Sequence, residues 1–100
     1  MSIFVLGEVD IGGLDRFLAV FGEEGAALRG EHGCLGARVF RAPTLAPASE
    51  GSVTVLLEWP DQASFEAFRA DPAAGPTMGK GGAKGPPRFT VLEPVATFDR

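Results

Sequence analysis

The sequence predicts an α+β domain in which two helices cover one face of a four-stranded antiparallel sheet. Two observations support this fold. Stretches with strand and helix periodicity follow each other in the order strand–helix–strand, strand–helix–strand. In addition, a strand that ends at Trp59-Pro60 leads directly into a helix that Asp61 can cap. This duplicated order is the split βαβ, or ferredoxin-like, arrangement, with the first and third strands in the middle. Residues 1–100 are expected to form a single domain.

The junction after residue 59 is the clearest local signal. Alternate residues of the strand predicted over 52–59 share one apolar face, because side chains alternate along an extended chain. Pro60 has no backbone N–H and should end the strand. Asp61 can accept the free N–H groups of the first helical turn. Phe65 and Phe68 then lie three residues apart, on one helical stripe.

The first half of the chain repeats this order. Residues 3–10 predict a strand that is largely apolar on both faces, so both faces should be covered. Residues 13–29 predict a helix, which its glycines weaken. Residues 34–41 predict the second strand, and a loop over 42–51 should join it to the third strand as an antiparallel pair. The apolar stripe of the helix consists of Leu14, Phe17, Leu18, Phe21, Gly25 and Leu28.

The segment 72–87 contains five Gly and four Pro in sixteen residues, which excludes regular structure throughout. It could be a lid over a pocket mouth or a plain flexible loop. Residues 88–98 predict the last strand, and Pro94 within it indicates an edge or a kink.

Composition excludes several classes of function. The net charge of −4 and the lack of a basic patch argue against nucleic acid. The N-terminus lacks the features of a signal peptide, and no stretch is long enough to span a bilayer, so no membrane is expected. A single cysteine, Cys34, fits a reducing cytoplasm. The spacing of ligating residues predicts no metal site, and no cofactor is expected.

The sheet is apolar on both faces, whereas two helices can cover only one. On the other face we expect Phe4, Leu6, Phe40 and Leu56, whose burial is worth about 1.5–3 kcal/mol each. The sequence therefore predicts a homodimer in which two sheets face each other. A partly apolar cavity is expected either between helices and sheet or between the two sheets.

Two stretches resemble the antibiotic biosynthesis monooxygenase family, of the dimeric α/β-barrel superfamily: Gly33-Cys-Leu-Gly-Ala-Arg-Val-Phe40 and Val55-Leu-Leu-Glu-Trp-Pro-Asp-Gln-Ala-Ser-Phe-Glu-Ala-Phe68. The resemblance implies a ferredoxin-like protomer, a dimer closed into a barrel, and often an exchanged C-terminal strand, here 88–98. Characterised relatives include cofactor-free oxygenases of aromatic polyketides, quinol oxygenases and haem-degrading enzymes. Trp59 matches a family Trp that lines the pocket in oxygenating members.

The resemblance is incomplete at other pocket positions. Polyketide oxygenases also use Asn and Tyr side chains, and this chain has neither. Haem-degrading members need a His after the Trp, whereas His32 is the sole histidine and precedes it. Haem degradation is therefore not expected.

Candidate catalytic residues are Glu8, Glu58 and Arg38. Glu8 and Glu58 are expected to end neighbouring parallel strands, and Arg38 lies within diagonal reach of Glu58. A half-buried carboxylate could be a general base towards an acidic phenol or anthrone, with Arg38 stabilising the anion. The alternative is an ion pair that sets the register of the dimer interface.

Other side chains carry weaker signals. Trp59 could stack on a flat ligand or could anchor the core between strand and helix. His32 could be an acid or base, but it lies in a turn where a solvated ring is the default. Cys34 could be a nucleophile, but a buried structural cysteine is commoner.

The leading hypothesis is a cofactor-independent monooxygenase acting on a flat phenol, quinol or anthrone. Two alternatives stay open: a non-catalytic dimeric protein that binds a small apolar aromatic molecule, and a cofactor-free isomerase or cyclase. The expected substrate pocket consists of Trp59, Phe4, Leu6, Phe40 and Leu56.

Overall fold

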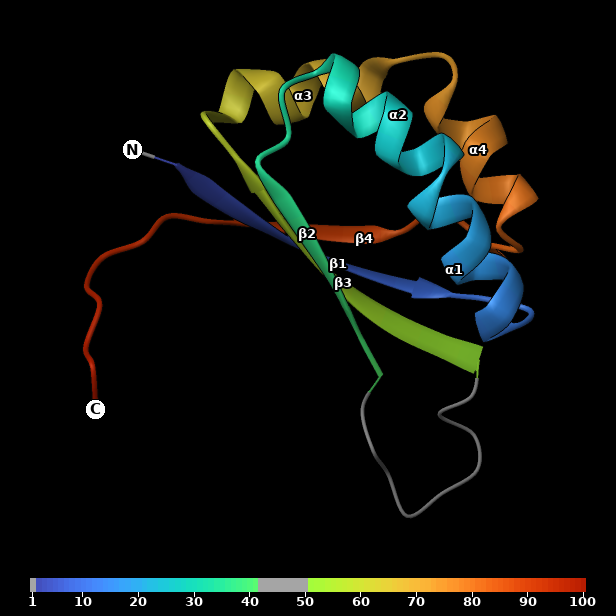
Figure 1. Cartoon of the computed structure of the whole chain (residues 1–100), viewed down its shortest axis with the longest axis horizontal. Coiled ribbons are helices and arrows are strands. Elements are labelled where there is room, and N and C mark those ends of the chain that lie inside the picture. Colours follow the sequence, from blue (N-terminus) through green and yellow to red (C-terminus); the bar gives the residue numbers. More distant parts are fainter. Residues whose placement is uncertain (1, 42–50) are drawn as a thin grey trace.

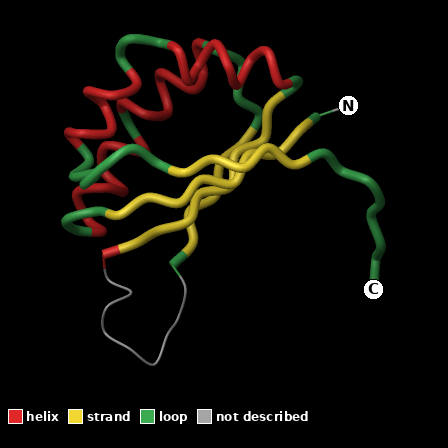
Figure 2. The backbone as a smooth tube through the Cα atoms, turned by 180° about the vertical axis from the view of Figure 1, so that it is seen from behind, coloured by secondary structure: helices red, strands yellow, loops and turns green. Residues whose placement is uncertain are grey.

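A computed structural model describes residues 2–41 and 51–100 (Figure 1). The loop predicted over 42–51 lies outside these residues, apart from Gly51. All helices lie on one face of a single sheet, which gives the molecule two layers (Figure 2). The elements follow in the order β1 (Ile3–Asp10), α1 (Leu14–Gly22), α2 (Glu24–Glu31), β2 (Gly36–Phe40), β3 (Ser52–Trp59), α3 (Gln62–Ala70), α4 (Ala74–Lys80) and β4 (Arg88–Leu92).

The sheet has the strand order β2-β3-β1-β4. The first and third strands are therefore central, as the sequence predicts, and every neighbouring pair is antiparallel. In the central pair, Leu6 lies opposite Leu56 and Val5 lies opposite Leu57. The predicted ferredoxin-like α+β fold is confirmed.

The core lies between the sheet and the helices. Trp59 and Phe65 are fully buried, and the Trp59 ring centroid lies 6.0 Å from that of Phe65 and 5.0 Å from that of Phe68. Val5 and Val53, from the two central strands, are also buried there. One strand end and one short helix thus provide the aromatic centre of the core, because Pro60 turns the chain directly from β3 towards α3.

Asp61 caps α3 as predicted. Its Oδ1 accepts a hydrogen bond from the backbone N–H of Ser64 at 2.8 Å. This bond lowers the pKa of Asp61, because it favours the charged carboxylate. The cap sets the starting point of the helix and therefore places Phe65 and Phe68 towards the sheet.

The helices differ from the prediction in two places. The helix predicted over 13–29 is two helices, α1 and α2, which meet at Glu23 directly after Gly22. The segment 72–87 contains a helix, α4, that its composition hides. Pro76 is the third residue of α4, where a missing backbone N–H costs no intrahelical hydrogen bond.

The sheet face opposite the helices is open. Phe4, Leu6 and Leu56 lie on it half-buried, and Phe40 is 46% exposed. β4 is an edge strand that ends at Leu92, shorter than the predicted strand over 88–98. The remaining residues 93–100 leave the body of the molecule (Figures 1 and 2).

No helix within residues 2–41 and 51–100 has the length and apolar character needed to cross a membrane.

Candidate functional site

A cavity of about 460 Å³ lies between the helices and the sheet. Its floor is the helix-facing side of the sheet, and all four helices contribute to its walls. The lining is mostly apolar and includes Val9, Val55, Leu57 and Phe89 from the strands and Phe17, Val20, Phe21, Leu28, Phe68 and Met78 from the helices. The volume falls within the range of about 300–1,000 Å³ that small-molecule sites occupy.

Much of the remaining wall comes from the Gly- and Pro-rich segment 72–87. Gly75, Thr77, Gly79 and residues from the stretch 81–87 contribute to it. The stretch is anchored to the end of β1, since the backbone N–H of Lys84 donates to the carbonyl of Asp10 at 2.8 Å, and the N–H of Gly12 donates to the carbonyl of Gly82 at 2.9 Å. The segment is therefore a packed part of the cavity wall. It contains the regular helix α4, whereas the sequence predicted either a lid or a plain flexible loop.

Arg29 lines the cavity from the last turn of α2. Its side chain is half-buried, and its Cζ lies 4.0 Å from the ring centroid of Phe21. A Cβ on Gly25 would lie 3.1 Å from the Arg29 Nη1, so the glycine leaves room for the guanidinium. Burial lowers the pKa of Arg29, because desolvation disfavours the charged form.

Arg69 lines the same cavity from the last turn of α3. It is exposed, and its Cζ lies 5.8 Å from the ring centroid of Phe89. Among the described residues, Arg29 and Arg69 are the charged groups of the lining, and neither forms an ion pair. The cavity thus combines apolar walls with positive charge and contains no carboxylate from the described residues.

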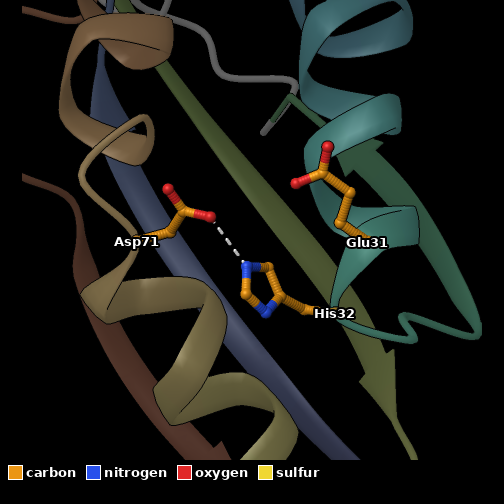
Figure 3. A group of neighbouring side chains, drawn as sticks. All are labelled: Glu31, His32 and Asp71. Carbon is orange, nitrogen blue, oxygen red and sulfur yellow. Dashed lines mark hydrogen bonds and ion pairs between the residues drawn. The ribbon is translucent and has the colours of Figure 1, made fainter.

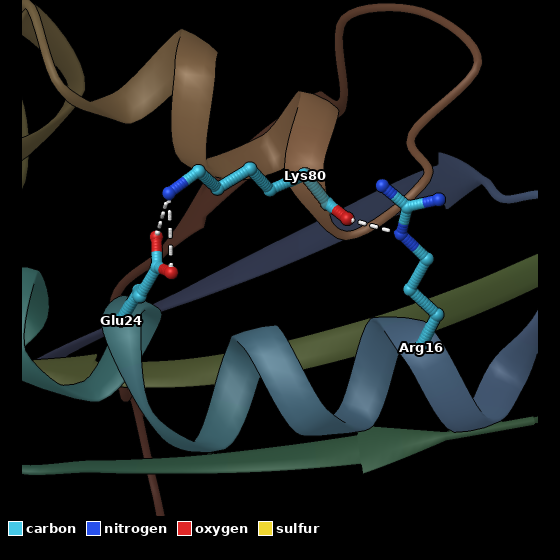
Figure 4. Close-up of polar contacts among 3 residues, drawn as sticks. All are labelled: Arg16, Glu24 and Lys80. Carbon is cyan, nitrogen blue, oxygen red and sulfur yellow. Dashed lines mark hydrogen bonds and ion pairs between the residues drawn. The ribbon is translucent and has the colours of Figure 1, made fainter.

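The end of α4 is fastened to the two N-terminal helices (Figure 4). Arg16 Nε donates to the backbone carbonyl of Lys80 at 2.6 Å, and Lys80 Nζ lies 3.2 Å from a carboxylate oxygen of Glu24. These contacts hold α4, which forms part of the cavity wall, against α1 and α2.

None of the five residues expected to form a substrate pocket lines this cavity. Phe4, Leu6, Phe40 and Leu56 lie on the open face of the sheet, because alternation along the strands points them away from the helices. Trp59 lies on the helix side but is fully buried, and Phe68 of the lining packs against its ring. Its Nε1 has no hydrogen-bond partner among the described residues.

The expected arrangement of Glu8 and Glu58 on parallel strands is wrong, because β1 and β3 are antiparallel. Glu8 lies opposite Thr54 and Glu58 lies opposite Phe4, so the two carboxylates are four residues apart along the sheet, about 13 Å. Glu8 Oε2 instead lies 3.3 Å from Arg88 Nη2.

Arg38 shares the open face with Glu58. Arg38 lies opposite Leu56, and Gly36 lies opposite Glu58, which gives the diagonal placement expected from the sequence. Glu58 Oε2, however, accepts a hydrogen bond from the Ser2 hydroxyl at 2.7 Å. Among the described residues, Arg38 and Glu58 form no ion pair.

A second group of polar side chains lies outside the cavity lining and consists of Glu31, His32 and Asp71 (Figure 3). His32 Nε2 lies 2.8 Å from Asp71 Oδ2, and all three residues offer a ligand atom within 4.8 Å of the others. One imidazole and two carboxylates are ligands that a divalent transition metal accepts. Sequence spacing did not predict this group, because Asp71 follows His32 by 39 residues and only packing brings them together.

In this group the His32–Asp71 hydrogen bond links two segments of the chain without needing a metal ion. The hydrogen bond from His32 lowers the pKa of Asp71, and a second bond from the Ala73 N–H to Oδ1 adds to this effect. His32 therefore faces Asp71, not Cys34. The Cys34 thiol lies 3.3 Å from the Gly36 carbonyl and 3.4 Å from the Glu58 carbonyl.

Comparison with known proteins identifies the family. The family profile described as antibiotic biosynthesis monooxygenase matches residues 3–78, which is most of the chain. The chain belongs to the antibiotic biosynthesis monooxygenase family. A search of curated protein sequences gives no significant match.

Solved structures of similar fold include members of this family. SnoaB from Streptomyces nogalater, a cofactor-independent oxygenase, has a TM-score of 0.75 at 16% identity and covers 99% of this chain and 98% of its own. A monooxygenase from the gene ActVA-Orf6 of Streptomyces coelicolor, in complex with nanaomycin D, has a TM-score of 0.66 at 15% identity, covering 97% and 90%. Rv0793 from Mycobacterium tuberculosis gives 0.66 at 15%, covering 97% and 98%. At these identities the similarity establishes the fold.

Sequence reasoning missed the charged residues of the cavity. Arg29 follows Phe21 by eight residues and Gly25 by four, which places it on the apolar stripe of the predicted helix. A cation on an apolar stripe, one helical turn after a glycine, was the signal that could have indicated a charged residue facing the cavity. Arg69 follows Phe65 by four residues and offered the same kind of signal.

Proposed function

We propose that the protein is a cofactor-independent monooxygenase that binds a flat phenol, quinol or anthrone in the cavity between helices and sheet. The observation that carries this proposal is the cavity of about 460 Å³, with apolar walls and aromatic side chains from the sheet and the helices. Such a site accepts a planar apolar ring system and excludes water from it. Family membership supports the reaction type.

The chemistry requires little from the protein. Loss of a proton from the substrate gives an electron-rich carbanion or phenolate, which reduces O₂ directly. For an anthrone, a new carbon–oxygen bond forms at the ring methylene, one oxygen atom stays as a carbonyl, and the other leaves as water with the two hydrogens. The protein contributes a dry pocket and stabilisation of the developing anion.

The reaction has two possible locations, which differ in how the substrate loses its proton. No carboxylate or imidazole of the described residues lines the cavity, so a substrate that reacts there enters already deprotonated, as the anion. Glu8 or Glu58 as base, with Arg38 as stabiliser, is proposed only for a ligand at the open face, where Phe4, Leu6, Phe40 and Leu56 would form the pocket with a second copy.

A homodimer is part of this proposal. The open face carries half-buried Phe4, Leu6 and Leu56, and Phe40 and Leu92 are 46% and 40% exposed. Residues 93–100 leave the body, and Val95 and Phe98 in them are 96% and 81% exposed. A second sheet would cover the face, and exchange of the C-terminal segment would cover these two side chains. A cytoplasmic location remains a prediction.

The test is oxygen uptake with a panel of anthrones and hydroquinones. A cavity-filling variant, Val20→Trp, should abolish uptake, because Val20 lines the cavity. Ala19→Trp is the matched control, since Ala19 is the exposed neighbour on α1 and is absent from the lining. A double variant, Glu58→Gln with Arg38→Gln, examines the open face. Uptake that survives V20W but is lost in the double variant would move the reaction to the dimer interface.

The absence of a base among the described lining residues favours one alternative, a protein that binds an aromatic molecule without reaction. In that case the ligand raises the melting temperature and no oxygen is consumed above the protein-free rate. An isomerase or cyclase would convert its substrate without oxygen consumption, which product analysis under argon detects.

A further inference from the structure

We propose that Arg29 and Arg69 make the cavity selective for aromatic molecules that carry a carboxylate, with Arg29 binding the carboxylate and Arg69 attracting it at the cavity mouth. This inference rests on the proposal that the cavity between helices and sheet is the ligand site. It adds the chemical class of ligand and the two residues that choose it.

The guanidinium of Arg29 is held in place by its neighbours. Phe21 lies under its guanidinium, with 4.0 Å between Cζ and the ring centroid, and buried Gly25 leaves the space that its Nη1 occupies. The face of the guanidinium is therefore covered by an aromatic ring. Its N–H groups lie in the plane of the fork and stay available to an acceptor in that plane. A carboxylate presents two such acceptors at matching spacing.

Arg29 has no carboxylate partner among the described residues. The side chain is half-buried, and burial lowers its pKa. A cation that has lost part of its hydration binds an anion more strongly than a fully solvated cation does. Among the described residues of the lining, Thr77 and Arg69 are the polar side chains left for the rest of the ligand, together with backbone groups. The cavity therefore fits one anionic group on an apolar ring system.

Arg69 occupies a different place. It is exposed while also lining the cavity, so it lies where the cavity meets solvent. Its Cζ lies 5.8 Å from the Phe89 ring centroid, and Phe89 is part of the cavity floor. The protein has a net charge of −4, so the field of the whole chain does not attract anions. Attraction at this point must come from the local cation, and it should weaken as salt is added.

The test compares two ligands of one shape. Anthraquinone-2-carboxylate and anthraquinone-2-carboxamide have the same ring system, and only the first carries a charge. Isothermal titration calorimetry with the whole chain should show about tenfold or greater preference for the carboxylate, the usual size of one hydrogen-bonded charge contact. Arg29→Gln should reduce that preference to within about threefold, because it weakens carboxylate binding far more than carboxamide binding.

Further variants separate the two arginines. Arg29→Lys keeps the charge without the planar fork and should retain part of the preference. Arg69→Gln, at an exposed position, should weaken carboxylate binding a few-fold and reduce its dependence on salt. Arg88→Gln is the control, because Arg88 is an exposed cation that pairs with Glu8 on the open face; it should change the binding of neither ligand.

The possible outcomes separate the two proposals. Equal binding of carboxylate and carboxamide by the unaltered protein, with both lost in Val20→Trp, overturns the anion selectivity and leaves the cavity as the ligand site. A second outcome is that binding of the two anthraquinones follows the prediction while the panel of anthrones and hydroquinones shows no oxygen uptake. That result supports the selectivity and contradicts the oxygenase proposal. If neither ligand binds, both the selectivity and the placement of the site in this cavity are wrong.

Discussion

His32 Nε2 lies 2.8 Å from Asp71 Oδ2, which joins the residue directly after α2 to the residue directly after α3. The two side chains are 22% and 20% exposed. Both helices contribute a cavity arginine, Arg29 and Arg69. The contact therefore fixes how the two helices that carry the positive charges sit relative to each other.

This contact should make stability depend on acid pH. The hydrogen bond from His32 lowers the pKa of Asp71 in the folded state. A lowered carboxyl pKa contributes stability above the unfolded value of about 3.9, and this contribution is lost as pH falls through the folded value. Asp71→Asn should therefore lower the melting temperature at neutral pH, and the difference from the unaltered protein should shrink below about pH 4.

The control for this measurement is Asp99→Asn, in the exposed C-terminal segment. It should leave the melting temperature unchanged across the same pH series. A difference between Asp71→Asn and the unaltered protein that stays constant down to about pH 2.5 would show that the carboxylate charge is not the cause.

Trp59 should behave as a core residue in stability measurements. It is fully buried, and the rings of Phe65 and Phe68 pack against it. Trp59→Ala should lower the free energy of unfolding by about 3–5 kcal/mol, since it leaves a large void. Trp59→Phe should cost less, because it keeps a ring and removes the unpartnered indole N–H. Urea unfolding followed by circular dichroism checks both; a cost below about 1 kcal/mol for Trp59→Ala would contradict the core role.

Gly7 should not tolerate a methyl group. A Cβ there would lie 2.9 Å from Val55 Cγ2 and 3.0 Å from Phe89 Cε1, and both neighbours are packed in the sheet. Gly7→Ala should lower the free energy of unfolding by about 1–3 kcal/mol. The same change at Gly22, where nothing lies within 4 Å, should be neutral or stabilise α1 by up to about 1 kcal/mol. Equal effects at the two glycines would refute the steric explanation.

The fastening of α4 should depend more on Arg16 than on the ion pair of Lys80. The Lys80–Glu24 pair is exposed, with side chains 63% and 48% accessible, so Lys80→Met should cost less than about 1 kcal/mol. Arg16→Met removes a charged donor from the carbonyl at the end of α4. Hydrogen exchange of the α4 amides should then accelerate about three- to tenfold. The prediction is wrong if the α4 amides exchange at the unaltered rate in Arg16→Met, or if they exchange faster in Lys80→Met than in Arg16→Met.

Much of the fold follows from local sequence. Pro60 ends β3, Asp61 caps α3, and alternation assigns residues to the two faces of the sheet. The central position of β1 and β3 follows from the order of elements alone. These features depend on residues close together in the chain, which a pattern can report.

Other features depend on packing between distant segments. Composition excluded regular structure throughout 72–87 and did not indicate the helix over 74–80, in which Pro76 is tolerated because it lies in the first turn. The long predicted helix breaks at Glu23, which ends α1 and begins α2. The placement of Glu8 beside Glu58 was wrong because it treated β1 and β3 as parallel, whereas neighbouring strands of the predicted antiparallel sheet run in opposite directions. A cavity between helices and sheet was one of the two expected locations, but its lining requires four helices, and only two were predicted.

The cavity wall made by α4 and residues 81–87 lies in a connection between α3 and β4 and contributes no strand to the sheet. Insertions or deletions in it can therefore enlarge or narrow the binding space while strand register stays intact. The size of the cavity and the fold of the sheet beneath it can thus change independently of each other.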